Sequence, residues 1–232
     1  MTKMPKTDTT PQTIADRIAS ILAERIVTGE LPPDAPLRQD HVAHEFGSSH
    51  VPVREAFQRL QAQGLAVSEP RRGMRVAPLD ERSMREVVEI RAALEVLALR
   101  HAARRLTPAQ IERIAEAVAA GDRAQSFAEW EAANRTFHRE LVAACRMPRL
   151  LAMLEELQLA NSRFAFAATR SAVWQPRSNQ DHRQILEALR RGAVDQAVAL
   201  LGRHIQTLER IGGGPAEIPE PATAASRTTA PR

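Results

Sequence analysis

A short amphipathic stretch, SHVPVREAFQRLQAQGL at residues 49–65, opens with side chains that can bind an anion. Ser49, His50 and Arg54 stand in its first two turns. Pro52 is compatible with a helix there, because the first turn has no internal partner for its backbone N–H groups. A serine at the cap can contact a phosphate, and an arginine can bind a phosphate or a guanine edge through two hydrogen bonds. The first turn of this predicted helix therefore has the chemistry of a DNA-contacting surface.

Positive charge is concentrated locally and is not a property of the whole chain. The 232 residues carry a formal net charge of +4, and residues 1–80 contain ten basic and ten acidic side chains. Between residues 54 and 75, five arginines face only Glu55 and Glu69. A nucleic-acid interpretation therefore depends on this arginine cluster and not on bulk charge.

The elements around this stretch follow the order of a winged helix-turn-helix. Apolar residues at helical spacing predict three helices, and two short apolar runs then flank the basic tip RRG. The helices are predicted at residues 14–28, 38–46 and 49–65, and the strands at residues 65–70 and 74–79. Two helices joined by a tight turn with a glycine, Gly47, form the helix-turn-helix pattern, and the hairpin forms its wing.

From Asp80 onward the sequence predicts only helices, about six of them over about 130 residues. Aromatic residues make up only 3% of the chain, which favours packed helices over a β-sandwich. The predicted fold class is mostly α: a winged helix-turn-helix of three helices and a small β-hairpin, then an all-α helical bundle. The predicted division is a disordered arm at 1–11, a DNA-binding domain at 12–78, a helical ligand-binding and dimerisation domain at 80–211, and a disordered tail at 212–232.

Cysteine usage and hydropathy favour the cytoplasm and exclude a membrane protein. The single cysteine, Cys145, lies in an apolar helical context and is interpreted as a core residue. No apolar run approaches the roughly 20 residues that span a bilayer, and the N-terminal residues lack an apolar signal core.

Residues 29–76, and PVREAFQRLQAQGL above all, resemble the N-terminal domain of the GntR family of bacterial winged helix-turn-helix regulators. The DNA-binding domain predicted at residues 12–78, which carries this resemblance, makes up about a third of the chain. It implies binding to a double-stranded DNA operator through residues of the second helix-turn-helix segment and the wing. The implied DNA-contacting residues are Arg38, Ser49, His50, Val51, Arg54, Arg71, Arg72 and Gly73. Most relatives have arginine where this chain has His50, which affects base preference but not the role of the position.

The helical region resembles the FCD effector domain of one large GntR subfamily, through EIRAALE, NRTFHRELVAAC, DHRQILEAL and LGRHIQTL. The resemblance implies a divalent metal site, suited to Zn²⁺ or Ni²⁺, with a small organic acid bound beside it. The implied metal ligands are Asn134, His138, His182 and His204. Spacing agrees with this set, because residues 134 and 138 share one helical face and the other two histidines lie on apolar sides of later helices.

Two residues depart from the family pattern. Asn134 stands where the family usually has aspartate, and Met147 where it usually has asparagine. An amide oxygen brings no charge to a metal, so metal affinity falls or the site binds ligand without metal.

The role of Arg91 has two interpretations. It could bind an effector carboxylate, or it could form a salt bridge with Glu95, four residues on. His41, His44 and His101 are interpreted as surface or packing residues.

The sequence thus favours a homodimeric repressor that binds an inverted-repeat operator and responds to a small metabolite. One alternative is a constitutive DNA-binding dimer whose effector site is disarmed, which the substitution at Asn134 favours. The other is a metal-dependent enzyme with three histidines that activate water. The enzyme interpretation is weak because no HExxH-like element is present and the nearest carboxylate by sequence, Glu140, falls on a different face from His138.

Overall fold

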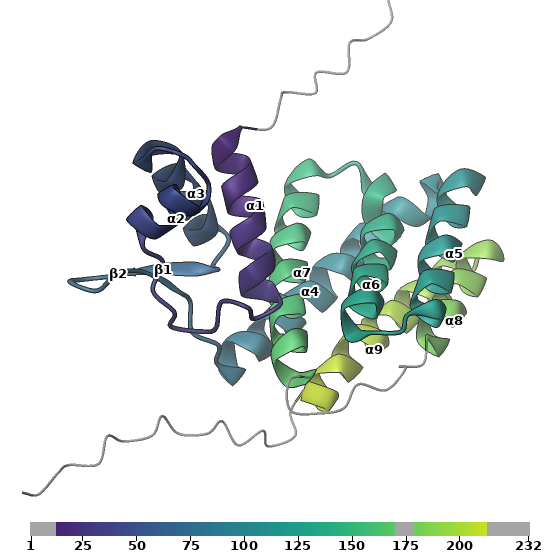
Figure 1. The fold of residues 1–232 in the computed structure, drawn as a ribbon. Coiled ribbons are helices and arrows are strands. Elements are labelled where there is room, and N and C mark those ends of the chain that lie inside the picture. The colour runs from purple at the N-terminus through teal and green to yellow at the C-terminus, as the bar shows by residue number, and fades with distance from the viewer. Residues whose placement is uncertain (1–12, 170–178, 213–232) are drawn as a thin grey trace, which may run out of the picture.

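The computed structural model describes residues 13–169 and 179–212, which form two units that pack side by side (Figure 1). The first unit contains three helices and a two-stranded antiparallel sheet, and the second consists of helices. The predicted mostly-α fold class is confirmed. Among the helices of the described residues, none is both long enough and apolar enough to cross a membrane.

The elements of the first unit are α1 (Ile14–Val27), α2 (Gln39–Glu45), α3 (His50–Ala62), β1 (Ala66–Glu69) and β2 (Gly73–Val76). Those of the second are α4 (Glu81–Ala102), α5 (Pro108–Arg123), α6 (Phe127–Val142), α7 (Pro148–Thr169), α8 (Gln180–Arg190) and α9 (Val194–Gly212), with 3₁₀ turns at Ala103–Arg105 and Ala143–Cys145.

The helices of the first unit begin and pack as their sequence dictates. Thr13 and Asp16 form a reciprocal capping box that satisfies the first free N–H groups of α1. The apolar faces of α1 and α3 then enclose one core, in which Ile18, Phe57 and Leu60 are almost fully buried. This core fixes the orientation of α3 relative to α1.

The wing is a tight hairpin whose tip carries the basic residues. Ala66 pairs with Val76 and Glu69 with Gly73 in antiparallel register. Arg71 and Gly73 have φ angles of 64° and 77°, and this left-handed backbone closes the turn. The predicted hairpin with a basic tip is therefore confirmed.

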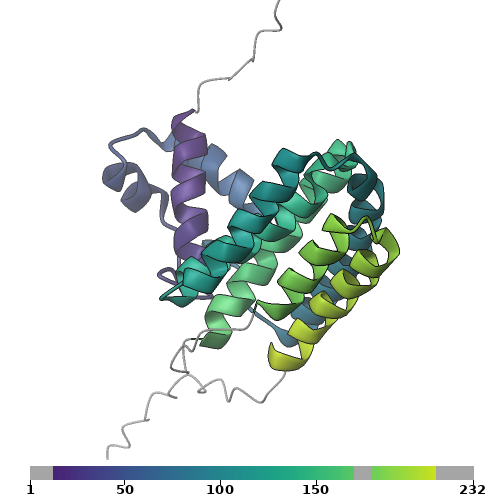
Figure 2. The same ribbon diagram turned by 90° about the vertical axis from the view of Figure 1, so that its right-hand side faces the viewer.

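In the second unit α4 packs against α6, α7 and α9, and the helices run side by side around an apolar core (Figure 2). Thr107 caps α5 and forms a capping box with Gln110. Helices α4 and α6 end at Ala102 and Val142, where the chain tightens into the two 3₁₀ turns. Cys145 is buried, as the sequence indicated.

A glycine on α5 allows the start of α8 to approach closely. A Cβ atom at Gly121 would lie 2.6 Å from the Asn179 Nδ2 atom. Asn179 is buried; its amide accepts a hydrogen bond from the Trp130 indole (3.2 Å) and donates one to Asp122 (3.0 Å). The residue before α8 is thereby tied to α5 and α6, which orients His182 three positions later.

The two units are joined through α7, which also packs against α1. Leu159 and Phe166 of α7 contact the core of the first unit. Between them, the buried guanidinium of Arg163 donates hydrogen bonds to the backbone carbonyls of Ala77 and Pro78, at the start of the connection to α4. Residues 1–11 of the predicted arm and 213–232 of the predicted tail lie outside the described residues, and Gly212 closes α9.

The Arg163→Met variant should lose about 2 kcal/mol of unfolding free energy, because two carbonyl groups lose a charged donor at a buried junction. Urea unfolding followed by circular dichroism measures this loss. Arg149→Met is the matched control, because Arg149 is exposed on the same helix and should change stability by less than about 0.5 kcal/mol. Equal losses in the two variants would contradict the role given to Arg163.

Candidate functional site

The N-terminus of α3 presents unused hydrogen-bonding groups to the outside. Ser49 occupies the N-cap position, yet its side chain makes no capping hydrogen bond to the helix. The first turn also lacks an acidic residue, so the positive end of the helix dipole is not compensated there. Ser49 therefore caps by position only, and its hydroxyl and the first backbone N–H groups suit a phosphate.

The residues predicted to contact DNA all lie at the surface of the first unit. Arg38, Ser49, His50, Val51 and Arg54 are exposed around the start of α3, and Arg71, Arg72 and Gly73 are exposed at the hairpin tip. The side chain of Val51 is 55% exposed and is of a type that can contact a thymine methyl group.

Two of these side chains have partners within the protein. The His50 Nε2 atom lies 3.4 Å from an Asp40 carboxylate oxygen, and the Arg72 guanidinium lies 2.6 Å from Glu69. Both pairs are exposed to solvent, where such an ion pair contributes little and can be exchanged for a phosphate.

Inside the second unit, three histidines from three helices converge. One ligand atom from each of His138 (α6), His182 (α8) and His204 (α9) lies within 4.8 Å of the others. The Nε2 atoms of His182 and His204 are 3.0 Å apart. Phe137 stacks on His182 with ring centroids 4.0 Å apart and holds that ring in place. The three histidines predicted from sequence are therefore brought together.

Carboxylates behind two of the histidines determine which nitrogen faces the cluster. The His138 Nδ1 atom lies 2.7 Å from Glu95, and the His204 Nδ1 atom lies 3.1 Å from Asp181. A carboxylate in this position accepts the Nδ1–H proton, so the Nε2 lone pair of each ring faces the cluster. The same carboxylate–histidine arrangement supports the ligands of many metal sites.

Glu95 is itself held in the charged form. It is fully buried, and the Arg91 Nε atom donates to it at 2.6 Å. Burial alone would raise the pKa of Glu95, but the charge of Arg91 and the hydrogen bonds from Arg91 and His138 outweigh burial and hold this pKa well below its ordinary value. The predicted Arg91–Glu95 salt bridge is present; binding of an effector by Arg91 stays a prediction.

The three imidazoles are neutral at pH 7. Burial lowers the pKa of His138 to about 4, although Glu95 acts in the opposite direction. Burial and the neighbouring histidines also lower the pKa of His182 well below its usual range, and burial lowers that of His204. Neutral imidazole is the form that binds a metal ion.

Asn134 lies one turn before His138 on α6, and its amide is held from behind. Its Nδ2 atom donates to Glu131 at 3.1 Å, and the Ser162 hydroxyl of α7 donates to the same carboxyl at 2.5 Å. Burial raises the pKa of Glu131, whereas the hydrogen bond from Ser162 and the nearby Arg91 and Arg135 oppose that rise. Asn134 Oδ1 and His138 Nε2 are buried and have no hydrogen-bond partner.

These residues fit a metal ion in their chemistry and approximately in their spacing. Nitrogen ligands about 2.0–2.1 Å from one ion lie about 3.4 Å apart in a tetrahedral site and about 3.0 Å apart at right angles. The Nε2 atoms of His182 and His204, 3.0 Å apart, already meet this spacing. The widest separation in the cluster, up to 4.8 Å, has to shorten by about 1 Å or more on metal binding. Two orphaned acceptors, Asn134 Oδ1 and His138 Nε2, would gain a partner. Three imidazoles and an amide oxygen are ligands that Zn²⁺ and Ni²⁺ accept.

Sequence reasoning missed the supporting carboxylates. Glu95 was considered only as a partner of Arg91, and Asp181 and Glu131 were not singled out. A carboxylate on an apolar helical face, as at Glu131, is the one signal that could have indicated them. Glu140 pairs instead with Arg113 at 2.8 Å, and Met147 packs against the core of the bundle. His41, His44 and His101 are exposed, as expected for surface residues.

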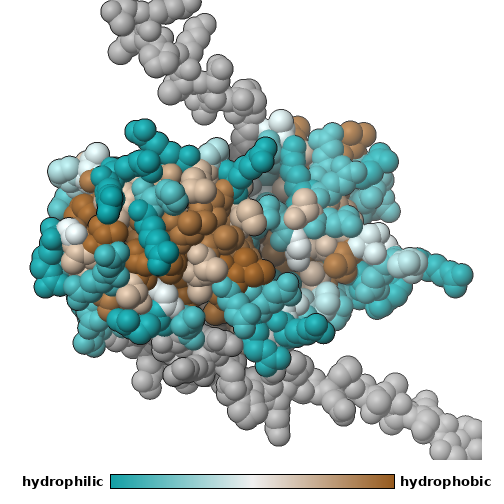
Figure 3. Space-filling view, turned by 180° about the vertical axis from the view of Figure 1, so that it is seen from behind, coloured by the Kyte–Doolittle hydropathy of each residue, from teal (hydrophilic) through white to brown (hydrophobic). Residues whose placement is uncertain are grey.

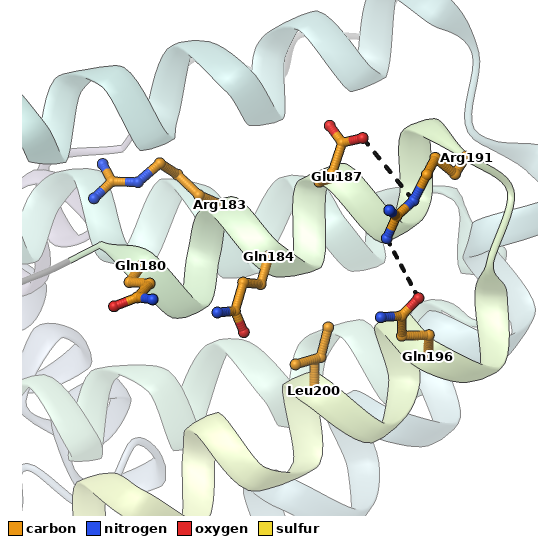
Figure 4. Close-up of a pocket in the computed structure, with 7 residues that line it drawn as sticks. All are labelled: Gln180, Arg183, Gln184, Glu187, Arg191, Gln196 and Leu200. Carbon is orange, nitrogen blue, oxygen red and sulfur yellow. Dashed lines mark hydrogen bonds and ion pairs between the residues drawn. The ribbon is translucent and has the colours of Figure 1, made fainter.

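A surface groove of about 340 Å³ is lined by residues of α8 and α9 (Figure 4). Helical spacing places the lining residues of α8 on the side of that helix opposite His182. Its charged groups are engaged: Arg191 contacts Glu187 and Gln196, and Arg183 pairs with Asp122 at 2.7 Å. It therefore offers a ligand less than the buried histidine cluster does.

Comparison with known proteins agrees with this architecture. Residues 14–76 match the family described as bacterial regulatory proteins, gntR family, and residues 86–207 match the FCD domain. The chain is 34% identical over 202 residues to the "Probable D-xylose utilization operon transcriptional repressor" of Paenarthrobacter nicotinovorans, covering 84% of this chain and 87% of that protein.

Solved structures share the fold. A GntR family transcriptional regulator from Pseudomonas syringae pv. tomato is 30% identical, with 86% of each chain covered and a TM-score of 0.54. Escherichia coli McbR/YncC has the same fold at 24% identity and a TM-score of 0.75, over 86% of this chain and 97% of that one.

The matched families and relatives are transcription regulators and not enzymes, which removes the metal-dependent enzyme from consideration. With a winged helix-turn-helix joined to an FCD domain, this chain belongs to the GntR family of DNA-binding transcription regulators.

Proposed function

We propose that this regulator is a homodimeric repressor that binds an inverted-repeat operator and responds to a small organic acid bound at a metal ion. The metal would be held by His138, His182, His204 and Asn134. The observation that carries the proposal is the cluster of three neutral histidines. The Nε2 atom of its His138 is buried without a partner, and so is Oδ1 of Asn134, one turn earlier on α6.

The operator contact would use the start of α3 and the hairpin tip. Arg54 would reach a base edge or phosphate in the major groove, Ser49 and the helix N-terminus would bind phosphate, and Arg72 would contact the backbone beside it. Each element is exposed and lies on the same unit. One such module makes few contacts for tight specific binding, so two copies on two half-sites are required.

The dimer surface we propose is the exposed apolar side of the bundle. Ile90 and Leu97 of α4 are each 39% exposed, and Met153 of α7 is 50% exposed. From behind, an apolar area covers the middle of the bundle (Figure 3). An apolar area of this kind is typical of a protein–protein interface, and a second copy of the chain would bury it.

The effector would bind where the metal and Arg91 provide positive charge. A bound metal held by these residues would supply a Lewis-acid centre for a carboxylate oxygen. The charge of Arg91 lowers the pKa of all three histidines, which indicates its closeness to the cluster. The enclosing apolar bundle excludes water and strengthens these attractions.

Coupling to DNA would pass through α7. Ser162 contacts Glu131 behind Asn134, and the next residue, Arg163, contacts the carbonyls of Ala77 and Pro78, which directly follow β2. A ligand that shifts α6 against α7 would move this connection and change the spacing of the two DNA-binding units.

An alternative function is a constitutive dimer whose effector site no longer works, and the neutral amide at Asn134 favours it. Small carboxylates would then leave the operator affinity unchanged.

The natural protein, purified without chelator or metal-affinity resin, should contain about one transition-metal ion per chain, as a four-ligand site predicts. His138→Ala should lose that metal, because its Nε2 is a central ligand, whereas His101→Ala on the exposed side of α4 should keep it. Elemental mass spectrometry measures the content. Metal in Asn134→Asp but none in the natural protein would support the disarmed-site alternative and contradict the metal-linked sensor.

Arg54→Ala should weaken operator binding by roughly tenfold or more, because an arginine contact to a base edge is lost. The operator is first selected from random duplexes, and Kd is measured by fluorescence anisotropy at one salt concentration. Arg139→Ala removes the same charge from an exposed position on α6 and should leave Kd within about twofold. Equal Kd values for the natural protein and Arg54→Ala would refute the contact.

Leu97→Glu should convert the dimer into monomers, because a charge would be buried in an apolar interface without a partner. Light scattering coupled to size-exclusion chromatography reports the mass. Gln184→Glu adds the same charge on the exposed side of α8 and should remain dimeric. A Leu97→Glu dimer would place the interface elsewhere.

A further inference from the structure

The amide of Asn134 can present either an oxygen or an NH₂ group to the histidine cluster, and only the oxygen is a metal ligand. Glu131 makes this choice in the present structure. Its carboxyl lies behind Asn134 and receives the Nδ2–H group at 3.1 Å and the Ser162 hydroxyl at 2.5 Å. A carboxylate only accepts hydrogen bonds, so it selects the orientation in which Nδ2 points back and Oδ1 points away.

The opposite end of the amide agrees with this selection. Oδ1 of Asn134 is buried and has no partner, and so is the Nε2 atom of His138 one turn later on the same face of α6. A buried acceptor without a partner costs about 1–3 kcal/mol. The structure therefore holds the amide with its oxygen free, where a bound cation would satisfy it.

We propose that Glu131 is a positioning residue that fixes the Asn134 amide with its oxygen toward the metal, so that the Asn134–Glu131 pair does the work of a single carboxylate ligand. This inference rests on the proposed metal-linked function. In this arrangement the negative charge lies on Glu131, behind the Asn134 ligand, and does not contact the metal directly.

One consequence distinguishes this role from a merely structural one. In the natural background, Glu131→Gln replaces a group that only accepts hydrogen bonds by an amide that can either accept or donate, so the Asn134 orientation is no longer selected and metal binding should weaken. In the Asn134→Asp background, the new carboxylate faces Glu131 across the same short separation and the two charges repel. There Glu131→Gln removes the repulsion and supplies a donor, so metal binding should strengthen.

The experiment measures Zn²⁺ and Ni²⁺ dissociation constants by competition with a chromophoric chelator for four full-length proteins. These are the natural chain, Glu131→Gln, Asn134→Asp and the double variant. Glu131→Gln should raise Kd by about 10-fold to 100-fold in the natural background, the usual effect of removing a residue that orients a metal ligand, and should lower it in the Asn134→Asp background. Thermal unfolding of the metal-free proteins checks that all four are folded.

Ser162→Ala is the milder companion variant, because it retains the Glu131 carboxylate and removes only its second donor. Its loss of metal affinity should be smaller than that of Glu131→Gln.

An unchanged Kd in Glu131→Gln, or the same fold-loss of metal affinity in both backgrounds, would overturn the positioning role while leaving the metal site intact. Absence of metal binding from both the natural chain and Asn134→Asp would overturn the metal-linked function itself, and the positioning role with it.

Discussion

The buried negative charge of Glu95 constrains how the helices of the bundle pack against one another. Removing an ionised carboxylate from water costs several kcal/mol unless partners replace the lost hydration. Arg91 provides one partner from the preceding turn of α4, and His138 provides the other from α6. Because both partners must meet Glu95 at hydrogen-bonding distance, the relative position of α4 and α6 is defined by chemistry as well as by apolar packing.

The same interaction prepares the histidine cluster. By accepting the Nδ1–H proton of His138, Glu95 directs the Nε2 lone pair toward His182 and His204. Asp181 acts on His204 in the same way, but from a more exposed position. The core of this domain and its candidate sensing site are thus one structure, so substitutions that disturb the buried ion pair would affect stability and site geometry together.

Helix α7 connects this site with the DNA-binding unit. Its Ser162 contacts Glu131 behind Asn134, and its Arg163 contacts the backbone that leaves the wing. Leu159 and Phe166 of the same helix pack on the core of the first unit. A rigid helix that touches both regions can transmit a small displacement without a flexible relay, because packed cores shift between discrete arrangements and do not deform continuously.

Local features of the sequence were sufficient for the elements and for the histidines. The capping residues Thr13 and Thr107 mark helix starts, the glycine in the RRG tip marks the wing, and residues 134 and 138 share a helical face by spacing alone. Resemblance to the GntR family and its FCD domain then indicated which histidines belong together.

Only the tertiary structure decided what lies behind those ligands. Glu95 and His138 are 43 positions apart, Asp181 and His204 are 23 apart, and Arg163 reaches a carbonyl 86 positions away. No periodicity encodes such partners, because helical spacing relates residues within one helix and is silent about which faces meet. The sequence by itself determined the fold class and the position of α3, and the resemblance it carries indicated the three histidines. Packing of α4, α6, α7, α8 and α9 decided which carboxylates stand behind those histidines and how α7 contacts the first unit, since each depends on a contact between different helices.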